Sequence, residues 1–162
     1  MKTQKFCQAI LLLCICLGSM QTYAQWVLVS DGVMPSYAMK GGYESDGTIL
    51  YIARIKYEGG IHVGKARANA REAFIPYGGK ELIITPYELY TGKARWVKVS
   101  GEGTPKDAVV GGNENNGTFL YIARAFIEGG WHIGKVRRNA TEAFIPYGGK
   151  EEIVSDFEIL VR

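Results

Sequence analysis

The sequence predicts an all-β fold, a β-sandwich-like unit made of two copies of one motif related by a pseudo-twofold axis. Three observations lead to this prediction: a long internal repeat, apolar residues that alternate with period two, and glycine-containing dipeptides that bound short apolar runs. The composition is that of a globular protein, because 47% of the 162 residues are apolar and only 5 are proline.

The repeat appears when the sequence is aligned with itself at an offset of 70 residues without a gap. Residues 26–92 then lie over residues 96–162, and about 37 of the 67 positions are identical. We therefore expect one repeat at residues 25–92 and a second at 96–162. Because only residues 91–95 link the copies, we expect them to pack as one compact unit, with terminal strands that can be exchanged.

Period-two alternation is clearest at residues 49–57. Ile49, Tyr51, Ala53, Ile55 and Tyr57 point to one side, which predicts a strand with one buried face. A dipeptide suited to a tight turn precedes this strand in each copy, Asp-Gly in the first and Asn-Gly in the second. Further predicted strands are 26–29, 37–40, 61–63, 82–84 and 87–90, each with an equivalent 70 residues later. Residues 76–79 predict a turn, and residues 66–73 have a weak helical pattern.

The first 24 residues predict a secretory signal peptide. Lys2 and Lys5 precede the apolar run ILLLCICL, and small residues suit a cleavage site before Gln25. The run is too short for a membrane helix, and no later segment resembles one, so we expect a secreted protein without membrane insertion. All three cysteines lie in this leader, which leaves residues 25–162 without thiols or disulfides.

Several functional classes are disfavoured. A net charge of +3 is too small to suggest nucleic-acid binding. No cysteine nucleophile, G-x-S-x-G motif or phosphate-binding loop follows the leader, so we expect neither an enzyme nor a bound cofactor. The sequence has no His/Cys cluster for zinc, and we expect no metal. Calcium bound by Glu44, Asp46 and Asn116 is an alternative. His62 is interpreted as a strand residue hydrogen-bonded on the polar face.

The polar residues that both copies share are the candidates for function. Glu44, Lys65 and Asn69 offer the acceptors and donors that bind sugar hydroxyls, and position 46 carries an oxygen in both copies, as Asp46 or Asn116. We expect the matched acidic and ammonium groups to face outward. The alternative interpretation is a set of surface ion pairs with little effect on stability. The full shared set is Glu44/Glu114, Arg54/Arg124, Glu58/Glu128, His62/His132, Lys65/Lys135, Arg67/Arg137, Asn69/Asn139, Glu72/Glu142 and Lys80/Lys150.

The shared motifs resemble the DM9 repeat. The specific segments are Leu-Tyr-Ile-Ala-Arg and Pro-Tyr-Gly-Gly-Lys-Glu, accompanied by Trp-Val, Gly-Gly, Glu-Gly-Gly and Gly-Lys. The resemblance implies interlocked repeats that form a homodimer and bind mannose-type glycans on cell or microbial surfaces, as in innate pattern recognition. It also implies that an acidic residue and the lysine of Gly-Lys contact the sugar, here Glu44 with Lys65 and Glu114 with Lys135. Glu stands at the acidic position where Asp is expected.

The sequence leaves two further questions open. Asn116 and Asn139 each begin an N-x-T sequon, so attached glycans could cover the second-copy site. Trp131 replaces Ile61 and would be a sugar platform if exposed, although alternation favours a buried position. The alternative to a lectin is a secreted structural or protein-interaction module that binds no sugar.

Overall fold

The structure, a computed structural model, describes residues 25–99 and 103–162, and the predicted signal peptide lies outside the described residues. These residues form an all-β fold, as predicted, with fourteen strands in one connected sheet. The first copy contributes β1 (Trp26–Val29), β2 (Lys40–Tyr43), β3 (Ile49–Tyr57), β4 (Gly60–Arg67), β5 (Ala73–Tyr77), β6 (Lys80–Ile84) and β7 (Tyr87–Tyr90). The second contributes β8 (Arg95–Lys98), β9 (Val110–Asn113), β10 (Phe119–Ile127), β11 (Gly130–Arg137), β12 (Ala143–Tyr147), β13 (Lys150–Val154) and β14 (Glu158–Val161).

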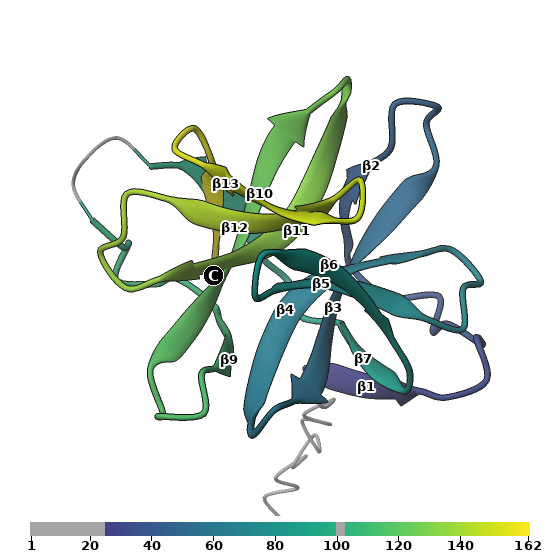
Figure 1. Cartoon of the computed structure of the whole chain (residues 1–162). Helices are drawn as coiled ribbons and strands as arrows, with labels where there is room; N and C mark the ends of the chain where they lie inside the picture. Colours follow the sequence, from purple (N-terminus) through teal and green to yellow (C-terminus); the bar gives the residue numbers. More distant parts are fainter. Residues whose placement is uncertain (1–24, 100–102) are drawn as a thin grey trace, which may run out of the picture.

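The strand pairings connect the two copies reciprocally. Strand β2 pairs with β3 of its own copy and with β11 of the other, while β9 pairs with β10 and with β4. Because β3 also pairs with β4, and β10 with β11, the strands β2, β3, β4, β9, β10 and β11 form a closed ring. Figure 1 shows the β12–β13 hairpin lying beside the β5–β6 hairpin, and these hairpins are linked through Lys150 and Lys80.

Three hydrophobic cores stabilise this arrangement. Each copy has a core of its own, and a third contains buried side chains of both copies, including Leu50, Ile52, Val63, Ile122 and Ile133. The sequence predicted one buried face for residues 49–57, but this expectation is wrong for the first half of β3. Leu50 and Ile52 are fully buried on the second face, because that face meets the other copy.

Turn chemistry explains how the long hairpins form. Before β3, Asp46 accepts a hydrogen bond from the amide of Thr48 at 2.9 Å, and Gly47 has a φ of 86°. Between β3 and β4, Glu58 and Gly59 both have positive φ, so the predicted end of the strand at these residues is confirmed.

Three local predictions differ from the structure. The strand predicted at 37–40 lies instead at 40–43. Glycine has a low strand propensity, so the sequence pattern does not indicate a strand at Gly41 and Gly42. Residues 66–73 contain no helix: β4 continues to Arg67, and Asn69 has a φ of 58° in the following turn. The turn predicted at 76–79 is limited to Gly78 and Gly79, because β5 continues to Tyr77.

Gly42→Ala is expected to lower the free energy of unfolding by about 1–3 kcal/mol. A Cβ at this position would strike the main-chain carbonyl of Trp131, where β2 meets the other copy, and no side-chain rotation can relieve that contact. Chemical denaturation followed by circular dichroism measures the change. Lys40→Ala, on the exposed end of the same strand, is the control, and equal stabilities of the two variants would contradict the close approach.

Candidate functional site

Two polar clusters lie where the copies meet, and each combines residues of both. The Lys65 cluster consists of Glu44, Lys65, Glu81, His132, Pro146 and Tyr147. The Lys135 cluster consists of His62, Tyr77, Glu114, Lys135 and Glu151. Neither copy contains a complete cluster, because the histidine and tyrosine always come from the copy that does not supply the lysine.

The Lys65 ammonium is almost completely enclosed, with only 3% of the side chain exposed. Its Nζ donates to the Pro146 carbonyl at 2.6 Å and lies 3.1 Å from Nδ1 of His132. The Glu81 carboxylate is 3.4 Å away, and the Tyr147 ring lies 5.5 Å from Nζ. Three acceptors therefore surround an ammonium with three N–H groups, so its hydrogen-bonding capacity is used within the protein.

The Lys135 ammonium is equally buried but has fewer close partners. Its Nζ lies 3.0 Å from Nδ1 of His62 and 5.5 Å from the centre of the Tyr77 ring. In the part of the chain that the structure describes, this is its single hydrogen bond, so N–H groups remain for another acceptor. Glu114 lies near the same ring nitrogen of His62, with Oε2 3.9 Å from Nδ1.

Burial also sets the protonation of the histidines. Desolvation, and next the charge of Lys135, lower the pKa of His62 to about 4, although Glu114 opposes the shift. The pKa of His132 is lowered to about 4 for the same reasons, with Lys65 as its cationic neighbour. Both rings are therefore neutral at pH 7, and Nδ1 accepts a hydrogen bond from the lysine. Burial lowers the pKa of Lys65 and of Lys135 as well, and nearby carboxylates oppose this.

An exposed ion pair lies at the outer side of each cluster. Glu44 accepts from Arg67 at 3.1 Å, and Glu114 accepts from Arg137 at 2.9 Å. Half of each arginine side chain is exposed, whereas each glutamate is 17% exposed. Each cluster thus presents a guanidinium donor and a carboxylate acceptor to solvent, with a buried ammonium behind them.

Local backbone geometry positions these groups. Gly64 precedes Lys65 because a Cβ there would strike the main-chain carbonyl of Phe74 in the neighbouring strand β5. The β5–β6 and β12–β13 hairpins are joined by two reciprocal hydrogen bonds. The Gly149 amide donates to Glu81 and the Gly79 amide donates to Glu151, both at 2.8 Å. The shared Gly-Lys and Pro-Tyr-Gly-Gly-Lys-Glu segments therefore assemble the junction between the copies.

The structure brings only some of the predicted site residues together. Glu44 acts electrostatically on Lys65, and Glu114 on Lys135, so each predicted pair shares a cluster. Asp46 is exposed in the turn that follows Glu44 and lies near Arg67, whose charge contributes to lowering its pKa after the hydrogen bonds from Thr48. Asn69 is exposed, and its amide contacts Met34 outside the cluster.

Two expectations about side-chain orientation are wrong. The matched ammonium groups were expected to face outward, yet Lys65 and Lys135 are buried, because the opposite copy covers β4 and β11. His62 is hydrogen-bonded on a strand, as interpreted, but it is buried at 1% exposure and not on a polar face. Within residues 25–99 and 103–162, no group of three or more His, Cys, Asp or Glu side chains could hold a metal ion.

Sequence reasoning did not assign the groups that complete each cluster to the sugar site. Arg67 and His132 belong to the shared polar set, and Glu81 and Tyr147 are also identical in the other copy. That internal identity is the signal that could have found them. Assigning them to a cluster required the pairing between the copies, which connects residues about 67 positions apart.

The sequence model of the DM9 repeat matches residues 8–84 and matches again at residues 69–154. The chain belongs to the DM9 repeat family. The search of curated proteins gave no match to this DM9 repeat protein.

Among solved structures, this DM9 repeat protein is similar to the crystal structure of the nematode sperm cell motility protein MFP2B. The TM-score is 0.58 at 14% sequence identity, and the match covers 84% of this chain and 45% of the other. The chain therefore spans less than half the length of that protein, and the likeness shows a shared fold. Within the described part of the DM9 repeat protein, no helix has the length and hydrophobicity for a membrane crossing.

Proposed function

We propose that this protein is a secreted, non-enzymatic lectin that binds mannose-type glycans through its two polar clusters. The observation that carries this proposal is the repeated pairing of an exposed guanidinium with a partly exposed carboxylate, Arg67 with Glu44 and Arg137 with Glu114. A sugar with neighbouring hydroxyls can donate to the carboxylate and accept from the guanidinium. The leader pattern at residues 1–24 supports secretion.

In this proposal the buried lysines have a different role from the one that the sequence suggested. Lys65 is saturated by internal acceptors, so it positions the cluster and supplies positive charge behind Glu44. Lys135 is equally buried, so it has the same role and supplies positive charge behind Glu114.

The two clusters make one chain bivalent. We further propose that the copies are related by a pseudo-twofold axis in a β-sandwich-like unit, and that homodimerisation doubles the number of sites. Binding to a surface with many glycans then gains from effective concentration, so weak individual sites give strong overall attachment.

Glu44→Gln combined with Glu114→Gln is expected to raise the dissociation constant for mannotriose at least about tenfold, the loss of roughly one charge-assisted hydrogen bond per site. A glycan array with residues 25–162 identifies the ligand, and isothermal titration calorimetry measures the affinity. Asp107→Asn, the same chemical change at an exposed pair with Arg95, is the matched control. Unchanged binding in the double variant, or an array without any bound glycan, would favour the protein-interaction alternative.

A further inference from the structure

A groove in the second copy lies outside both polar clusters. It has a volume of about 310 Å³ and is lined by Lys98, Phe126, Trp131, Asp156 and Glu158. Phe126 and Trp131 are cross-strand partners on β10 and β11, with ring centres 5.7 Å apart and an angle of 66° between the planes. The groove therefore has an aromatic floor between two neighbouring strands.

This floor is held in place before any ligand arrives. The Arg124 guanidinium lies 4.5 Å from the Trp131 ring and 4.5 Å from the Trp96 ring, and it pairs with Glu158 at 2.7 Å. Because Trp131 contacts both this guanidinium and Phe126, the indole is fixed, whereas Phe126 is 56% exposed. An exposed ring beside a fixed one offers a binding surface whose side chains lose little conformational entropy when a ligand binds.

The charges around the groove compensate each other. Lys98 and Asp156 pair at 3.0 Å at its rim, and Glu158 is neutralised by Arg124. A charged ligand gains no net attraction here. A neutral ligand with one apolar face and several hydroxyls suits this groove. Its apolar face can pack on Phe126, while Lys98 can donate to one hydroxyl and Asp156 can accept from another.

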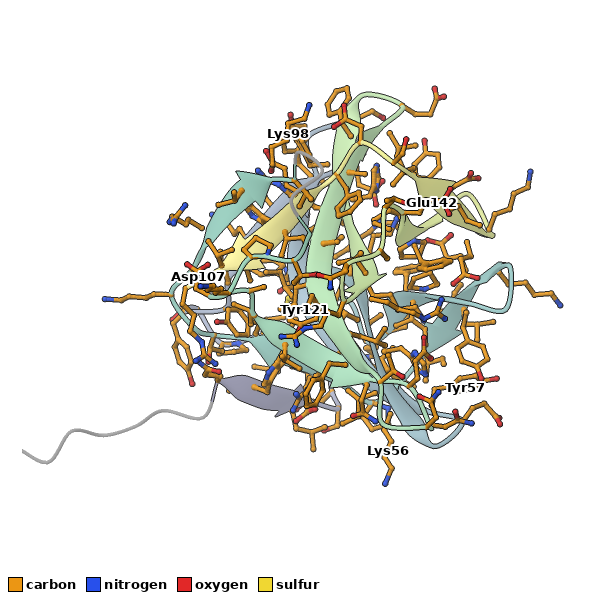
Figure 2. The ribbon with its side chains drawn as sticks, turned by 90° about the vertical axis from the view of Figure 1, so that its left-hand side faces the viewer. Lys56, Tyr57, Lys98, Asp107, Tyr121 and Glu142 are labelled. Carbon is orange, nitrogen blue, oxygen red and sulfur yellow. The ribbon has the colours of Figure 1, made fainter. Side chains whose placement is uncertain are left out.

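The first copy lacks this surface. At the positions of Phe126 and Trp131 it has Lys56 and Ile61, and its corresponding groove contains Leu28 and Pro86 in place of Lys98 and Asp156. Figure 2 shows Lys98 and Lys56 at opposite ends of the molecule, so the two grooves are well separated. The copies thus share the buried clusters but differ in this feature.

We propose that the groove lined by Phe126 and Trp131 is a second carbohydrate subsite, distinct from the polar clusters, for pyranose rings with equatorial hydroxyls. In such a ring the axial C–H bonds form an apolar face that packs on the electron-rich face of Phe126. The equatorial hydroxyls at the ring edge then reach Lys98 and Asp156. The ligand class rests on the proposed function, while the subsite and its preference for equatorial sugars go beyond it.

The test uses residues 25–162 with cellotriose, whose β-linked rings carry equatorial hydroxyls, and with mannotriose as the second probe. Phe126→Lys with Trp131→Ile installs the side chains of the first copy at the equivalent positions, and calorimetry measures both affinities. We expect cellotriose affinity to fall at least about tenfold and mannotriose affinity to stay within twofold. Phe126→Lys alone, at an exposed position, is included so that the result does not depend on Trp131 packing, and it is expected to weaken cellotriose binding several-fold.

Glu44→Gln with Glu114→Gln separates the two proposals, because it should lower mannotriose affinity and leave cellotriose affinity unchanged. Tryptophan emission provides an independent signal, which cellotriose should shift in the unmodified protein and not in the Trp131→Ile variant. The subsite is overturned if cellotriose does not bind, or if both groove variants bind it as the unmodified protein does. Either result leaves the polar clusters standing when mannotriose binding still depends on Glu44 and Glu114.

Discussion

Lowering the pH from 7 to 5 is expected to destabilise the fold by about 2 kcal/mol for each of the two buried histidines. In the folded protein the pKa of His62 and of His132 is about 4, against 6.5 for an exposed ring. The unfolded chain therefore binds protons that the folded chain does not, and stability falls as the pH drops below 6.5. The loss is complete only below pH 4, where the folded rings also take up protons.

The pKa of each ring is low because the ring is buried and lies next to a lysine ammonium. His62 faces the Lys135 ammonium and Glu114, and His132 faces Lys65 with Glu44 and Glu81. Protonating either ring removes the acceptor of the lysine and places two positive charges about 3 Å apart. The carboxylates reduce this repulsion but do not outweigh the desolvation of the ring.

Urea denaturation at a series of pH values measures this effect. His62→Gln combined with His132→Gln is the comparison, because the amide oxygen can accept from the lysine and does not titrate. Its stability should be nearly constant between pH 6.5 and 4, in contrast to the unmodified protein. Parallel curves for the two proteins would show that the histidines are not the source of the pH dependence.

Ile52→Ala is expected to cost about 2–5 kcal/mol and to lower the stability of both copies together. Ile52 is fully buried in the core that the copies share, and its neighbours there include Val63, Ile122 and Ile133. A cavity at this point loses contacts on both sides of the junction. We therefore expect a single unfolding transition at a lower temperature, and not one transition for each copy.

Differential scanning calorimetry distinguishes these outcomes. The matched control is Ile83→Ala, the same change at a side chain that is 64% exposed, which should alter stability by less than about 0.5 kcal/mol. Two separate transitions in the Ile52→Ala variant would show that the copies unfold independently, and the proposal of one compact unit would then fail.

Short-range patterns were sufficient to predict several strands. Strands 26–29, 49–57 and 87–90 have the predicted bounds, and for 49–57 these are set locally by the Asp-Gly turn before it and by Glu-Gly at its end. Strand β2 could not be placed in this way. Its Gly41 and Gly42 are selected by the approach of Ile133 and of the Trp131 carbonyl from the other copy, which no local propensity encodes.

In the candidate site, too, the residues could be predicted from the sequence, but their surroundings could not. The internal repeat singled out Glu44 and Lys65, and the structure places them in one cluster. Their environment could not be predicted, because His132, Pro146 and Tyr147 reach Lys65 only through strand pairing across the junction. Lys65 was therefore expected to face solvent, as a charged side chain on an alternating strand usually does, whereas the second copy encloses it.

The division of each cluster between the copies has an evolutionary consequence. A chain with a single copy could complete neither cluster, and it would have to associate with another such chain at a concentration above their dissociation constant. The short linker at residues 91–95 replaces that encounter by an intramolecular one, for which effective concentrations are about millimolar. Duplication thus behaves as a covalent tether, which keeps both clusters assembled at any dilution and leaves each copy free to diverge on its outer surface.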